Sequence, residues 1–123
     1  MYRLTVESGF ASAHQLREYE GKCERLHGHN WRVQVTVKTE RLNRIGIGID
    51  FKLMKTWLNE ILSVLDHAFL NEVPPFTLQN PSSENLARYI FEEFEKRIEG
   101  EPVQVEWVRV WESAGACAQY SEE

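Results

Sequence analysis

Histidines are the residues of this chain whose types and spacing point most directly to chemistry. All four lie in short motifs with other reactive groups: His14, the pair His27 and His29 separated by one glycine, and His67 directly after an aspartate. Residues two apart on a β-strand point to the same side. His27 and His29 can therefore present two imidazoles to one point, with His14 as the third. Three neutral imidazoles and an open fourth position are typical of a catalytic zinc site.

The residues alone leave two interpretations of the His-Gly-His segment. It could be a strand end with a flexible turn and no ligand role. Alternatively, the strand that ends near His14 pairs with the strand that follows His29, which would bring three rings to one locus. Gly28 would then have a reason, because no side chain would crowd the face opposite the metal.

Cys23 lies shortly before this segment. It could close the site as a fourth, structural ligand, or act as a base or nucleophile, because a nearby cation favours the thiolate. A small buried apolar role is the third interpretation. The charged neighbours Lys22, Glu24 and Arg25 disfavour it, whereas Cys117, between two alanines, suits an inert role.

Carboxylates occupy two further positions of interest. Asp66-His67 falls at the end of an apolar helical pattern, where the helix dipole favours a cationic imidazole. An aspartate can fix a histidine's tautomer and raise its basicity, but adjacent side chains seldom bond each other, and a helix C-cap histidine is the alternative. Glu112 follows an apolar strand. It is either an exposed strand end or a buried acceptor, suited to two parallel N–H groups of a planar ring edge.

Strands must position the histidines. The first is predicted from Tyr2 to about Ala13. The second covers 31–38, where apolar and polar side chains alternate with the period of a half-buried strand. A polar segment, 17–22, separates them, and a third, shorter strand is expected over 45–49, interrupted by two glycines.

Two helices follow. Asp50 is the expected N-cap of the first, Ser82 or Ser83 caps the second, and Gly100 ends it. A proline-containing loop, 71–81, separates the helices. The predicted buried stripes are Phe51, Met54, Leu58, Ile61, Leu62 and Leu65 in the first helix, and Leu86, Ile90, Phe91, Phe94 and Ile98 in the second.

A long strand from Val103 to about Trp111 comes next, with a bulge where its alternation slips at 107–108. A final short strand covers 116–120. Strands before and after a run of helices predict an α+β fold, in which an antiparallel sheet carries two helices on one face. The other face would be uncovered, and self-association is the expected way to cover it.

Composition restricts the function classes. The 123 residues suit one domain, 1–123, and a net charge of −5 argues against a nucleic-acid-binding surface. No apolar run reaches the length of a membrane span, and the first residues are predicted to form a strand rather than a signal peptide. Two cysteines make no disulfide framework, so a reducing cytoplasm is the expected compartment.

Six motifs in this order resemble one family, that of 6-pyruvoyltetrahydropterin synthase and 6-carboxytetrahydropterin synthase. They extend over nearly the whole chain: Phe10-Ala11-Ser12-Ala13-His14, Cys23 with His27-Gly28-His29, Ile49-Asp50-Phe51, Leu65-Asp66-His67 with Leu70-Asn71, residues 80–87, and Trp111-Glu112-Ser113. The resemblance implies a tunnelling fold (T-fold) whose trimers close their sheets into a barrel. Two trimers would stack into a homohexamer with active sites at subunit interfaces.

The resemblance also implies the site. Zinc would be bound by His14, His27 and His29. Cys23 would be the general base or acid, with Asp66 and His67 as its acid–base partners, and Glu112 would anchor the pterin. The substrate would be 7,8-dihydroneopterin triphosphate, with Arg17, Lys22 and Arg25 as candidate triphosphate ligands.

The spacing between Cys23 and the His-Gly-His segment resembles the queuosine-pathway branch. Its products would be 6-carboxy-5,6,7,8-tetrahydropterin, acetaldehyde and triphosphate. A related branch uses a glutamate at the position of Glu24 as a base to form 6-hydroxymethyl-7,8-dihydropterin, and 6-pyruvoyl formation is a further alternative. We expect Glu24 to be a solvated loop charge. The rivals from other classes are a non-catalytic zinc- or pterin-binding oligomer and a structural zinc site closed by Cys23.

Overall fold

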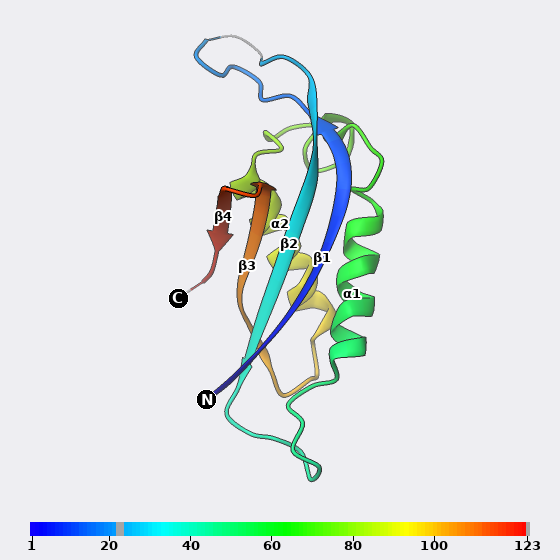
Figure 1. Ribbon diagram of the computed structural model, residues 1–123, viewed down its shortest axis with the longest axis vertical. Helices are drawn as coiled ribbons and strands as arrows, with labels where there is room; N and C mark the ends of the chain where they lie inside the picture. The colour runs from blue at the N-terminus through cyan, green and yellow to red at the C-terminus, as the bar shows by residue number, and fades with distance from the viewer. Residues whose placement is uncertain (22–23, 123) are drawn as a thin grey trace.

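One antiparallel sheet and two helices make up the fold (Figure 1). The computed structural model describes residues 1–21 and 24–122. The sheet order is β1-β2-β3-β4, and both helices lie on the same face of the sheet. The elements are β1 (Tyr2–His14), β2 (His27–Thr39), α1 (Phe51–Ser63), a 3-10 turn η1 (Leu70–Glu72), α2 (Ser83–Arg97), β3 (Gln104–Ser113) and β4 (Ala116–Tyr120). The predicted α+β class is confirmed, and no helix among the described residues is long and apolar enough to cross a membrane.

β1 and β2 pair without a break from Tyr2↔Thr39 to His14↔His27. The alternating valines of β2 face the helices and are fully buried, as their period of two predicts. β2 begins at His27, earlier than the predicted start at residue 31, because its first residues continue to pair with β1. The histidine segment is therefore part of a strand and not a flexible turn.

Both helices begin at the side chains that the sequence indicates. Asp50 accepts a hydrogen bond from the Lys52 backbone N at 2.8 Å, and Ser82, not Ser83, accepts one from the Asn85 N at 3.2 Å. The apolar stripes are buried against the sheet, except that Phe51, the first residue of α1, is 54% exposed. Phe51 is therefore not part of the core stripe, and Ser83 is left available for another contact.

Two local predictions are wrong. Residues 45–49 form a turn and not a strand, because the Asn43 side chain accepts from the backbone N of Ile45 and of Ile47, each at 3.0 Å, and Gly46 has a φ of 84°. The bulge of β3 lies at Glu106, since Trp107 pairs with Thr36 while Val105 already pairs with Val37.

The face of the sheet away from the helices is mainly polar. Its side chains bond one another across the strands, as in Arg3 with Glu106, Gln34 Nε2 donating to Glu7 at 2.9 Å, and Arg109 Nε donating to Gln119 at 2.8 Å. Arg32 also lies over the Trp111 ring of this face, and the Trp111 Nε1 is buried without a hydrogen-bond partner among the described residues. The expectation that self-association covers this face stays a prediction.

Candidate metal centre

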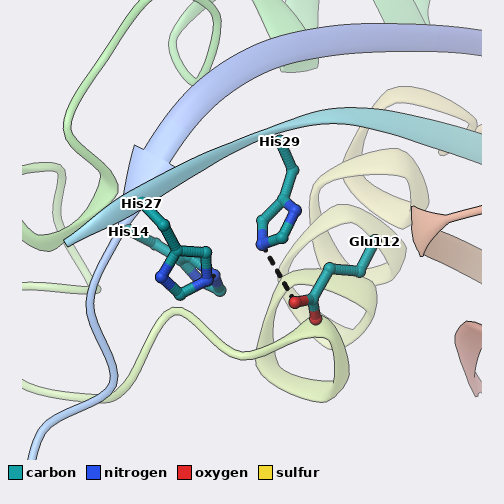
Figure 2. Close-up of side chains that lie close together, drawn as sticks. All are labelled: His14, His27, His29 and Glu112. Atoms are coloured by element: carbon teal, nitrogen blue, oxygen red, sulfur yellow. Dashed lines mark hydrogen bonds and ion pairs between the residues drawn. The ribbon is translucent and has the colours of Figure 1, made fainter. Parts of the chain in front are cut away.

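Three histidines meet where β1 ends and β2 begins. The register places His14 opposite His27 and His29 opposite Ser12, so all three rings lie on the helix-facing side of the sheet. Their ring centroids are 4.6 to 5.0 Å apart (Figure 2). The predicted convergence of the three rings is confirmed. It follows from strand pairing, which places residues that are 13 positions apart side by side.

Backbone carbonyls set the tautomers of two of these rings. His14 Nδ1 donates to the Pro81 O at 2.8 Å, and His27 Nδ1 donates to the Arg25 O at 2.8 Å. A carbonyl can only accept, so both Nδ1 atoms carry the hydrogen. Both Nε2 atoms are then lone-pair donors toward the space between the rings, which is the form of histidine that binds a metal.

His29 and Glu112 form the other side of the cluster. The Nε2 of His29 lies 2.9 Å from Oε1 of Glu112, yet it is buried and makes no well-directed hydrogen bond. A cation between the carboxylate oxygen and the ring nitrogen would satisfy both atoms. Burial lowers the pKa of His29, opposed by the Glu112 charge. Burial therefore favours the neutral imidazole that a metal requires.

A break in the strand register places Glu112. The pairing of β3 with β4 shifts between Trp111 and Ser113, so Glu112 has no partner in β4. Bulges of this kind redirect a side chain. The other carboxylate oxygen of Glu112 accepts from Ser83 Oγ at 3.2 Å, and the side chain is 38% exposed. Glu112 thus lies between the two predicted alternatives: it is a partly exposed acceptor that contacts Ser83 and His29.

The donor atoms fit a zinc ion. One ligand atom from each of the four side chains, His14, His27, His29 and Glu112, lies within 4.8 Å of all the others. Neutral imidazoles with a carboxylate suit zinc among the biological metals. The orphaned Nε2 of His29 and the facing lone pairs of the other two histidines are groups that an ion would satisfy.

The Trp31 side chain forms the base of this site, a contact that the alternating pattern over 31–38 does not by itself indicate. Its indole is 2% exposed and stands edge-on to His14 and His29, with ring centroids at 4.9 and 5.0 Å. Its Nε1 donates to the Ser12 O at 3.4 Å. The signal was present, because Trp31 continues the period-2 series of His27 and His29 on the same face.

Asp66 and His67 form a second polar group, on the edge of β1. Asp66 Oδ1 accepts from the Ala11 N at 2.9 Å, and Oδ2 lies 2.9 Å from His67 Nδ1. The expectation that these neighbours seldom bond each other is wrong here, because His67 has a left-handed φ of 53° that turns its ring back to the aspartate. The Ala11 N–H, and after it His67, lowers the pKa of Asp66.

This pair is separate from the histidine cluster. The backbone N and O of Ala11 that point away from β2 bond to Asp66 and His67, whereas the histidine cluster lies on the helix-facing side of the strands. Neither Asp66 nor His67 belongs to the group of possible metal ligands among the described residues. The His67 side chain is 84% exposed. The structure therefore does not bring all predicted site residues together within one described chain.

Glu24 lies in the loop before β2, and its side chain is 29% exposed. Its carboxylate lies 3.7 Å from His27 Nδ1 and 3.4 Å from the Leu16 N, and its backbone N donates to the Leu16 O at 2.8 Å. The expectation that it is only a solvated loop charge stays a prediction. Cys23 and Lys22 lie outside the described residues.

Arg17 was a candidate for binding phosphate, and its contacts point elsewhere. The guanidinium donates to the carbonyls of Phe76 at 2.7 Å, Asn71 at 3.2 Å and Gln79 at 3.2 Å. These bonds use the guanidinium to hold the loop 71–80 against the end of β1. Arg17 therefore holds this loop in place, and its expected role in binding phosphate stays a prediction.

The sheet, its two helices and the histidine–carboxylate cluster define a tunnelling-fold protein with a candidate metal centre. The family described as "6-pyruvoyl tetrahydropterin synthase" matches residues 3–123. The chain belongs to this family and is a lyase similar to 6-carboxytetrahydropterin synthase.

Three relatives show the range of similarity. The 6-carboxy-5,6,7,8-tetrahydropterin synthase of Synechocystis sp. is 37% identical and covers 98% of this chain and 93% of its own. The dihydroneopterin monophosphate aldolase of Pyrococcus furiosus is 31% identical over 89% of each chain. The structure of Caenorhabditis elegans 6-pyruvoyl tetrahydropterin synthase is 26% identical, with a TM-score of 0.85 over 100% of this chain and 98% of that one.

Proposed function

We propose that the protein is a zinc-dependent 6-carboxy-5,6,7,8-tetrahydropterin synthase of queuosine biosynthesis. It would convert 7,8-dihydroneopterin triphosphate to 6-carboxytetrahydropterin, acetaldehyde and triphosphate. The main support for the proposal is the cluster of three histidines. Hydrogen bonds from Nδ1 to backbone carbonyls leave the Nε2 atoms of His14 and His27 free for a metal, and the Nε2 of His29 has no hydrogen-bond partner within the described part of the chain. The relative from Synechocystis, a 6-carboxy-5,6,7,8-tetrahydropterin synthase that is 37% identical to this chain, supports the choice of reaction.

His14, His27 and His29 would hold the zinc ion. Zinc bound there supplies a Lewis acid for a substrate oxygen. His67 would exchange a proton with the substrate at Nε2, because Asp66 occupies its Nδ1. Cys23 would serve as the second proton-transfer group.

Glu112 would orient the pterin. Its carboxylate can accept two parallel hydrogen bonds from the amino group and ring N–H of the substrate. It already lies at the mouth of the histidine cluster, 2.9 Å from His29. A fixed orientation at this point would keep the substrate side chain next to the metal.

Assembly would complete the site. In our proposal a second copy brings its exposed Asp66–His67 pair to the histidine cluster of the first. The outer edge of β1 supports pairing between copies. At one end of this edge, the backbone groups of Ala11 and Ala13 that point away from β2 bond to residues 66–69. The corresponding backbone groups of residues 3–9 have no strand partner within the described chain, so they are available to a strand of a second copy. Strand pairing along this edge would extend the sheet toward the barrel of a homohexamer.

A second reaction is supported by Glu24. Its carboxylate lies beside a candidate metal ligand, 3.7 Å from His27 Nδ1. One relative at 31% identity is named a dihydroneopterin monophosphate aldolase. Formation of 6-hydroxymethyl-7,8-dihydropterin, with Glu24 as base, is therefore the alternative, ahead of 6-pyruvoyl formation.

Product analysis tests the proposal. Zinc-loaded protein is incubated with 7,8-dihydroneopterin triphosphate, and the pterin is identified by mass spectrometry. We expect 6-carboxytetrahydropterin with acetaldehyde, and loss of turnover with zinc retained in Cys23→Ala. A 6-hydroxymethyl product that disappears in Glu24→Gln would instead establish the alternative. Cys117→Ser, at an exposed cysteine of β4, is the matched control.

A further inference from the structure

Glu112 contacts His29, one of the candidate metal ligands, and a role as substrate anchor does not explain this contact. We propose that in the substrate-free protein Glu112 is a fourth metal ligand, which closes the coordination sphere that the three histidines begin. The inference rests on the metal site of the proposed function. It adds a state in which the carboxylate faces the metal before it faces the substrate.

Distances within the cluster support this coordination. The Nε2 atoms of His14 and His27 are 3.0 Å apart, and His29 Nε2 and Glu112 Oε1 are 2.9 Å apart. Ligand atoms of a tetrahedral zinc ion at ordinary bond lengths lie about 3.4 Å from one another. All four ligand atoms already lie within 4.8 Å of each other, so small side-chain movements suffice.

The position of Glu112 comes from elements outside the histidine strands. The register shift between Trp111 and Ser113 leaves Glu112 out of the β3–β4 pairing. Ser83, the first residue of α2, donates to Oε2 at 3.2 Å and leaves Oε1 toward His29. Figure 2 shows the carboxylate approaching His29 from the side opposite His14 and His27. Glu112 therefore occupies the side of the cluster that the histidines leave open.

Charge gives a reason for this arrangement. Three neutral imidazoles leave the full charge of a divalent ion in a half-buried site, and one carboxylate removes half of it. A tetrahedral sphere with four protein ligands has no open position, and in our proposal substrate oxygens take the place of Glu112 on the metal. The released carboxylate would then find the amino and N–H edge of the pterin as its new partner. Substrate binding and opening of the site would be the same event.

Metal affinity tests the inference without an activity assay. Zinc affinity is measured by competition with a chromophoric chelator for the wild type, Glu112→Gln and Glu84→Gln. Glu84 is an exposed carboxylate in the first turn of α2 and is outside the cluster. Loss of a residue that only hydrogen-bonds a metal ligand weakens metal binding about ten-fold or more, so loss of a direct ligand in Glu112→Gln should weaken zinc binding at least as much. Glu84→Gln should bind zinc like the wild type. The Co²⁺-substituted wild type and Glu112→Gln should also differ in their visible absorption bands.

Two results overturn the inference, and they differ in meaning. Equal zinc affinity and identical Co²⁺ spectra in the wild type and Glu112→Gln would exclude Glu112 as a ligand and leave the proposed function intact. Failure of the wild type to bind zinc would overturn the metal site itself and the proposed function with it. Circular dichroism of each variant verifies that it is folded.

Discussion

His14 and His27 face each other across the β1–β2 pair with their Nε2 atoms 3.0 Å apart, and each ring is fixed by a hydrogen bond from Nδ1 to a backbone carbonyl. Two lone pairs at this distance repel each other unless a proton or a metal ion lies between them. The fold therefore holds the cluster in a form that a cation stabilises.

Zinc should raise the stability of the protein. At a free zinc concentration about 100 times Kd, we expect the free energy of unfolding to rise by about 2.7 kcal/mol. His27→Ala removes one ligand and should abolish most of this gain, as thermal unfolding with and without zinc will show. Asn30→Ala, an exposed site on the opposite face of β2, should keep the gain. An equal gain in both variants would contradict a site at His27.

Trp31 should matter for the metal as well as for the core. Trp31→Leu leaves a cavity behind His14 and His29, and we expect a loss of about 2–4 kcal/mol in the free energy of unfolding together with weaker zinc binding, because the rings lose their edge-on contact. Trp57→Leu is the control, since Trp57 of α1 packs against Phe94 of α2 with ring centroids 5.9 Å apart. It should reduce stability without changing zinc affinity. Unchanged zinc affinity in Trp31→Leu would show that the contact of Trp31 with His14 and His29 does not support metal binding.

Two strand glycines should respond differently to alanine. A Cβ at Gly9 would lie 2.7 Å from the Trp31 backbone O, which cannot move without disturbing the β1–β2 pairing. We expect Gly9→Ala to lose about 1–3 kcal/mol in chemical denaturation. A Cβ at Gly28 would meet the Ser12 O at 3.6 Å, an ordinary contact. Gly28→Ala should therefore be tolerated within the chain, and the expectation that Gly28 leaves the face opposite the metal uncrowded stays a prediction.

Asp66 should contribute stability that depends on pH. Its pKa is held below the usual value, first by the Ala11 N–H and then by His67. A carboxylate with a lowered folded-state pKa stabilises the fold above the pKa of the unfolded chain and loses this contribution as the pH falls through the folded value.

Asp66→Asn should therefore be less stable than the wild type at pH 7, and the difference should shrink as the pH falls below about 4. Urea denaturation at a series of pH values measures it, with the exposed Glu99→Gln as control. Turnover of Asp66→Asn should fall while its zinc content stays the same, because His67 lies outside the metal group of the described residues. A pH-independent difference would exclude the ionic role of Asp66.

Much of the arrangement was determined by the sequence itself. Local rules are sufficient for the caps Asp50 and Ser82, for the buried stripes of both helices, and for the alternation of β2 that places His27 and His29 on one side. Each of these depends on residues within a few positions of one another, where period and hydrogen-bonding capacity decide the conformation.

The tertiary structure alone decided which distant groups meet. Glu112 reaches His29 through a register shift and a serine from α2, Pro81 fixes the tautomer of His14 from 67 positions away, and Ala11 orients Asp66 across the edge of β1. The contacts of Glu24 with Leu16 and of Arg17 with the carbonyls of the loop 71–80 likewise depend on segments that are distant in the sequence. Sequence period sets the side on which a residue lies, but long-range pairing sets its neighbours, and the chemistry of this site is a property of those neighbours.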